Sequence, residues 1–147
     1  MNAARLAARA IELLGPHEGP IEFEAPRASR LAAALTVGRR IATPEETPVA
    51  AVVVFLGVPA KPSERQAILD RVRQRLPAGA PIVLVDHNQP RAPWRRAMAL
   101  APLLARGLAP ARARYPAARE LAAQGFTIDR LRLACGERIQ LVAARRK

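Results

Sequence analysis

The sequence is poor in aromatic residues and cysteine, and each shortage narrows what the protein can be. Aromatic side chains make up 3% of the 147 residues, so the core has to be built from alanine, leucine, valine and isoleucine. The single cysteine, Cys135, excludes a disulfide within the chain and a zinc site made of several cysteines. There is no run of about 18 apolar residues and no charged-then-apolar leader. We therefore expect one cytoplasmic domain at residues 1–147, without a transmembrane segment.

Acidic residues are scarce in the second part of the chain. Residues 1–58 carry six arginines and six glutamates, so residues 59–147 carry the other eighteen of 24 basic residues and six of 12 acidic ones. The net charge of +12 therefore lies wholly in the second part. Two interpretations remain open: an arginine-rich composition without a purpose, or a basic face for nucleic acid, an acidic partner or anionic lipid.

Hydrophobic periodicity in the first part predicts two helices and a short strand. Residues 2–14 and 29–37 have apolar residues at helical spacing, and Asn2 and Ser29 are suited to cap these helices. Residues 21–24 alternate apolar and charged side chains, as a half-exposed strand does.

The second part contains the stronger pattern. Residues 49–58 and 82–85 are apolar, β-branched runs, which are typical of strands buried on both faces. Between them, residues 64–76 carry an apolar helical stripe, and Arg65 is predicted to face away from it. This order predicts a right-handed βαβ unit. Two further helices and a β-hairpin are predicted at 93–107, 116–124, 128–133 and 138–143.

Four segments occur in an informative order: AVVVFLGV, RQRLPAGAPIVLVD, AAQGFTIDRL and CGERIQLVAARRK. This succession resembles the fourth strand, the fifth strand with its preceding helix, the corner before the sixth strand, and the last strand of class I S-adenosylmethionine-dependent methyltransferases. The resemblance covers residues 49–147. It implies a three-layer Rossmann-like α/β fold with a reduced, mostly parallel sheet, ordered 1-4-5-7-6 in the family's labels, with the last strand antiparallel.

Upstream of residue 49 the sequence departs from that family. The family has an acidic residue followed by a glycine-rich cofactor loop, whereas here Glu24 precedes Ala25, Pro26, Arg27 and Ala28. Proline fixes φ and removes a donor, and alanine resists the positive φ that glycine tolerates. The family's second and third strands are also missing, because Val37 and Val49 are only twelve positions apart.

The resemblance therefore implies a truncated and degenerate domain. Its parts are an N-terminal helix and loop at 1–20, a degenerate cofactor-loop region with a linker at 21–48, and the C-terminal half of the fold at 49–147. The linker is expected to feed the strand at 49–58 directly, which leaves the strand at 21–24 as a sheet edge that the helix at 2–14 would cover.

No cofactor is expected unless the resemblance is functional, in which case the cofactor is S-adenosylmethionine. Its candidate ligands are then the family's acidic position, two loop positions and the one acid that matches the family's ribose-binding carboxylate: Glu24, Ala25, Ala28 and Glu45. No metal site is predicted.

Asp86 and His87 follow the buried strand at 82–85, at the edge where ligands bind in open α/β folds. They are the candidate catalytic residues, because a histidine there would act as a general base or donor near neutral pH. The alternative is a solvated loop in which Asp86 or Asn88 caps the next helix. The sequence leaves both interpretations open.

No acidic residue occurs from Pro90 to Arg119, a stretch that contains Trp94 and Tyr115. Arginines and aromatics together bind phosphates and stack on bases, lie on membrane surfaces, or pack on a partner subunit. Trp94 is interpreted as a helix-packing anchor. The candidate residues for nucleic acid or a partner are Arg91, Trp94, Arg95, Arg96, Arg112 and Arg114.

Three functions follow from these observations. The first is a binding, scaffold or regulatory subunit that has lost independent cofactor binding and associates with itself or with an intact methyltransferase. The second is a small S-adenosylmethionine-dependent methyltransferase that is active only with a partner chain. The third is a basic nucleic-acid-binding module.

Overall fold

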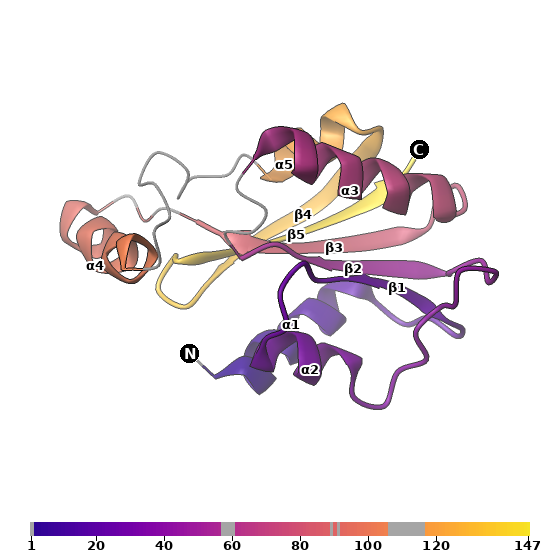
Figure 1. Ribbon diagram of the computed structural model, residues 1–147, viewed down its shortest axis with the longest axis horizontal. Coiled ribbons are helices and arrows are strands. Elements are labelled where there is room, and N and C mark those ends of the chain that lie inside the picture. The colour runs from indigo at the N-terminus through magenta and orange to yellow at the C-terminus, as the bar shows by residue number, and fades with distance from the viewer. Residues whose placement is uncertain (1, 57–60, 89, 91, 106–116) are drawn as a thin grey trace.

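The protein is described by a computed structural model that covers residues 2–56, 61–88, 90, 92–105 and 117–147 (Figure 1). A five-stranded sheet lies between two layers of helices. The elements in chain order are α1 (Ala3–Leu14), β1 (Ile21–Glu24), α2 (Arg30–Thr36), β2 (Ala50–Val54), α3 (Pro62–Arg75), β3 (Pro81–His87), α4 (Pro93–Leu104), α5 (Ala117–Ala123), β4 (Phe126–Ala134) and β5 (Ile139–Arg146).

The sheet is open and mixed, as the sequence predicted. Its order is β1-β2-β3-β5-β4, with β1, β2 and β3 parallel and β5 antiparallel to both of its neighbours. The predicted hairpin thus returns β5 between β3 and β4, next to the strand at 82–85. Because β1, β2 and β3 are parallel, they end at one edge of the sheet, which we call the carboxyl edge.

Side chains of the central strands alternate between two hydrophobic cores. On one face, α1 and α2 cover Val52, Val54, Val83 and Val85. On the other face, α3 and α5 cover the intervening positions, such as Leu84. Both faces of β2 and β3 are therefore buried, which explains why their sequences are nearly continuous apolar runs.

The helix starts follow local chemistry. The side chain of Asn2 accepts a hydrogen bond from the backbone N–H of Arg5, and Ser29 Oγ accepts one from Ala32 at 3.0 Å. Both side chains therefore cap as predicted. At α3, Lys61 occupies the cap without a side-chain bond, and a proline begins the helix, where its missing N–H costs nothing.

At the outer edge of β1 the linker pairs with the first residue of the strand, and the prediction that α1 covers this edge is wrong. Ile21 donates its N–H to Arg40 and accepts one from Ala42, each at 2.9 Å, which forms an isolated parallel bridge to Ile41. α1 instead packs against α2 and beneath β3 and β5. It lies there because its buried stripe supplies much of the apolar cover for that face of the sheet.

Arg75, in the last turn of α3, joins β1 to the linker beside it. Its Nη1 lies 2.6 Å from a carboxylate oxygen of Glu22, and its Nη2 donates to the carbonyls of Thr43 and Glu46. The side chain of Glu22 is buried, and this burial raises its pKa more than the charge of Arg75 lowers it.

The raised pKa of Glu22 predicts a pH-dependent effect of Glu22→Gln. The folded protein holds a proton on Glu22 more readily than the unfolded chain, so this group's contribution to stability is present below the unfolded pKa and is lost as pH rises. Glutamine removes that loss. We expect the stability of Glu22→Gln relative to the parent protein to increase between about pH 4 and pH 7 in urea unfolding. A difference that stays constant or decreases over this interval would contradict the prediction.

Candidate functional site

The parallel strands bring Glu24, Val54 and Asp86 to the carboxyl edge, one at or near the end of each strand. This is the edge at which open α/β folds bind ligands, because the loops that leave it diverge. The polar side chains at this edge determine which ligands or reactions it could support.

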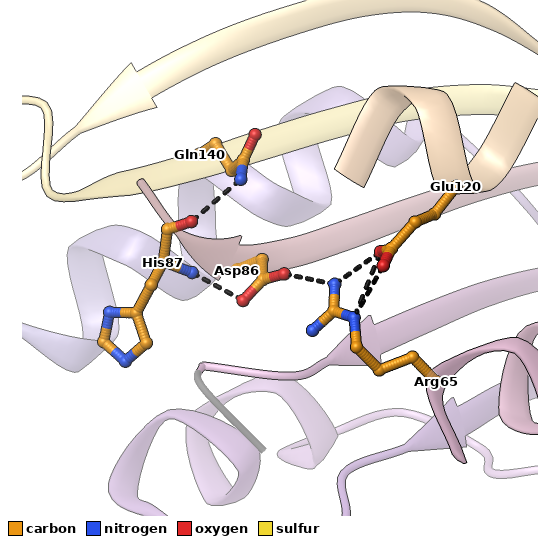
Figure 2. A network of polar contacts seen from close by, with 5 residues as sticks. All are labelled: Arg65, Asp86, His87, Glu120 and Gln140. Carbon is orange, nitrogen blue, oxygen red and sulfur yellow. Dashed lines mark hydrogen bonds and ion pairs between the residues drawn. The ribbon is translucent and has the colours of Figure 1, made fainter. Parts of the chain in front are cut away.

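A buried ion network lies at the end of β3 (Figure 2). Arg65, from the first turn of α3, is 1% exposed, and Asp86 is fully buried. The two side chains meet at 2.5 Å between Nη2 and Oδ2. Arg65 was predicted to face away from the apolar stripe of its helix, but its side chain is buried, and its guanidinium pairs with the carboxylates of Asp86 and Glu120.

Glu120 of α5 supplies the second carboxylate. Its Oε2 lies 2.6 Å from Arg65 Nη2, and its two oxygens accept from Arg65 Nε at 3.0 and 3.1 Å. The guanidinium also lies over the ring of Phe55, with 4.3 Å to the ring centroid. Arg65 thus ties together α3, α5 and the ends of β2 and β3.

The charges in this network support one another. Burial alone would lower the pKa of Arg65, but the hydrogen bonds to Glu120 and the charge of Asp86 outweigh it and raise that pKa. A buried arginine that faces two carboxylates stays charged, and each carboxylate keeps a cationic partner. The network is therefore a structural contact between α3, α5 and β3.

The predicted catalytic residues, Asp86 and His87, are adjacent at the end of β3. Oδ1 of Asp86 accepts the backbone N–H of His87 at 2.7 Å, while Oδ2 bonds Arg65. The imidazole of His87 points away from the network (Figure 2). Gln140 of β5 donates to the His87 carbonyl at 2.8 Å and fixes the strand end. The two carboxylate oxygens of Asp86 thus hold the start of α3 and the end of β3 together, and a catalytic role for Asp86 and His87 stays a prediction.

The predicted cofactor residues are divided between the carboxyl edge and the opposite edge, where the parallel strands begin. Glu24 ends β1 at the carboxyl edge, and Ala25 and Ala28 follow it in the next turn. Glu45 lies in an exposed turn at the opposite edge, because its neighbours Ala42 and Val49 hydrogen-bond to the start of β1. The structure therefore does not bring Glu24 and Glu45 together.

Of the predicted basic candidates, Trp94, Arg95 and Arg96 lie on α4 and are exposed. Trp94 is 61% exposed, so its interpretation as a packing anchor is wrong. The other three, Arg91, Arg112 and Arg114, lie outside the described residues.

Sequence reasoning missed Arg65, Glu120 and Phe55 as members of one site. One signal was present: Glu120 is the first acidic residue after Asp86, beyond the stretch that lacks acids. It also lies one residue before Leu121, which α5 buries against the sheet. An isolated acid beside a buried position indicates a buried cation, although the sequence did not indicate which arginine.

Two kinds of site are missing from the part of the chain that the structure describes. Within it, no group of three or more histidine, cysteine, aspartate or glutamate side chains is arranged to hold a metal ion. No helix among these residues is both long enough and apolar enough to cross a bilayer.

Comparison with known proteins finds similar folds but no similar sequence. The sequence matches no family model and no curated protein. The fold is similar to the N-methyltransferase NodS from Bradyrhizobium japonicum, with a TM-score of 0.59 and 12% identity over 97% of this chain and 94% of that one. It is also similar to an O-methyltransferase family 2 protein from Planctomyces limnophilus, with a TM-score of 0.55 and 15% identity over 86% of this chain and 42% of that one.

A third similar structure is the pyocyanin biosynthetic protein PhzM, with a TM-score of 0.55 and 12% identity over 69% of this chain and 31% of that one. The chain thus spans less than half the length of PhzM and of the Planctomyces protein. At these identities the likeness defines a fold and no activity. The protein has a class I methyltransferase-like fold, as the sequence resemblance implied.

Proposed function

We propose that this protein is a degenerate methyltransferase-like domain that does not bind S-adenosylmethionine by itself and serves as a binding, scaffold or regulatory subunit. The observation that carries the proposal is the ion pair that Glu24 makes at the end of β1. Its carboxylate lies 2.7 Å from the guanidinium of Arg71, so the acid that would meet the cofactor is already paired with α3.

The turn after Glu24 supports the same conclusion. Residues 25–29 contain no glycine, and none of them has a positive φ. Ser29 caps α2 with its own hydroxyl, which occupies the backbone N–H of Ala32. A glycine loop offers a ligand close approach to the backbone and free helix N–H groups. This turn offers less of both.

The strands that would flank the adenosine part of the cofactor are also missing among the described residues. Where the family has two further strands, one parallel bridge at Ile41 borders β1. Glu45, the single candidate for the ribose carboxylate, lies at the other edge. The residues present therefore do not fit S-adenosylmethionine.

The chain retains a sheet with a hydrophobic core on each face, and this favours binding as its function. The ion pairs of Arg65 join α3 and α5 to the end of β3. A second copy of this chain or an intact methyltransferase is the proposed partner, since a domain with this fold offers surfaces that can pair with its own kind.

Calorimetric titration of the purified protein with S-adenosylmethionine, and separately with S-adenosylhomocysteine, tests the loss of cofactor binding. An intact class I methyltransferase under the same conditions is the control. We expect no binding at micromolar concentrations. A micromolar dissociation constant for the protein alone would overturn the proposal. Binding only in a mixture with a methyltransferase partner would favour the alternative of an enzyme completed by that partner.

A further inference from the structure

Helix α4 stands away from the sheet (Figure 1). It carries three large apolar side chains that are exposed. Trp94 is 61% exposed, and Met98 and Leu104 are each 52% exposed. Soluble proteins seldom present contiguous large apolar side chains on a projecting element unless something binds them. The strip therefore needs an occupant.

The arrangement of charges on α4 indicates the chemistry of that occupant. At about 100° per residue, Trp94, Met98 and Leu104 fall within an arc of about 120°. Arg95 and Arg96 lie on the two sides of this arc, and α4 contains no acidic residue. The guanidinium of Arg95 lies 5.0 Å from the centroid of the Trp94 ring. An apolar strip between two cations is the pattern of a helix that lies in a membrane interface.

Other occupants satisfy only part of this pattern. A second copy that packed its own α4 on this strip would bring arginine against arginine, because α4 carries no acid. A nucleic acid would bind the arginines but would leave Met98 and Leu104 exposed to water. An anionic bilayer takes the apolar strip into its acyl boundary and the arginines among its phosphates.

We propose that α4 is an anionic-lipid-binding helix that rests in the membrane interface through Trp94, Met98 and Leu104, with Arg95 and Arg96 at the headgroups. Such a helix lies on the surface and does not cross the bilayer. The proposal does not depend on whether the domain binds S-adenosylmethionine.

Trp94 is the only tryptophan, so its fluorescence reports directly on α4. We would titrate the full chain with vesicles of phosphatidylglycerol and phosphatidylcholine, and with vesicles of phosphatidylcholine alone. The expected result is a blue shift and co-sedimentation with the anionic vesicles, weakened by salt. No shift with anionic vesicles would overturn the proposal, as would an equal response to neutral ones. A shift with RNA or with an acidic polypeptide, but not with anionic vesicles, would also overturn it.

Variants of α4 separate the contribution of the arginines from that of the apolar strip. Arg95→Gln with Arg96→Gln should weaken partitioning about 25-fold, at about fivefold for each cation. Met98→Ser with Leu104→Ser should abolish the blue shift, whereas Leu131→Ser with Leu133→Ser is the matched control. These leucines of β4 are 48% and 45% exposed and lie on another element, so their loss should leave binding unchanged. A control pair that weakens binding as much as the α4 pair would contradict the placement of the site.

Discussion

Replacing Arg65 with methionine should destabilise the protein by about 3–5 kcal/mol. The substitution removes the cation but leaves Asp86, which is fully buried, and Glu120, whose side chain is 14% exposed, without their shared partner. Breaking a buried ion pair from one side costs more than the pair contributes, because the remaining charge stays out of water. Urea unfolding followed by circular dichroism would measure the loss.

A surface arginine of the same helix provides the control. Arg71→Met breaks the ion pair to Glu24, in which the arginine side chain is 58% exposed, and should cost no more than about 1 kcal/mol. Arg65→Lys keeps a charge but loses the planar fork that meets two carboxylates, so we expect an intermediate loss. This variant measures the network even if the methionine variant does not fold. Equal stability of Arg65→Met and Arg71→Met would contradict the structural role of the network.

The second large effect is expected at Leu84, in the centre of β3. Its side chain is fully buried beneath α3 and α5, so Leu84→Ala leaves a cavity that the surrounding strands and helices fill only in part. We expect a loss of about 2–5 kcal/mol in the free energy of unfolding. Thermal unfolding and urea unfolding should agree on the size of the effect.

Leu131 of β4 is the matched control for Leu84. It is the same residue type in the same sheet, but it is 48% exposed, so Leu131→Ala should cost about 1 kcal/mol or less. If the two substitutions cost the same, β3 would not be the central strand that is buried on both faces.

Most of the sheet could be predicted because its strands carry unmistakable local patterns. The strand from Ala50 to Val54 and the segment from Ile82 to Val85 are apolar and rich in β-branched residues, and both lie in central strands that pair in parallel. Helix ends at Asn2 and Ser29 were predictable for a related reason, since capping depends on a few neighbouring residues.

The candidate site was less predictable because its contacts join distant parts of the chain. Arg65 and Glu120 are 55 positions apart, and nothing local distinguishes Arg65 from the surface arginines of α3. Asp86 was placed correctly at the carboxyl edge, but its buried ion pair with Arg65 was not predicted. The exposure of Trp94 likewise depends on where α4 projects, and helical spacing says nothing about that.

The sequence by itself determined the α/β class, the buried central strands, the basic second part and the missing glycine loop, because each is a property of adjacent or periodic residues. Only the tertiary structure decided which arginine is buried, which segment covers the edge of β1, and that Glu24 and Glu45 lie at opposite edges. Those outcomes depend on how helices cross the sheet. A buried charge is stable only where the fold brings its opposite charge within a few ångströms.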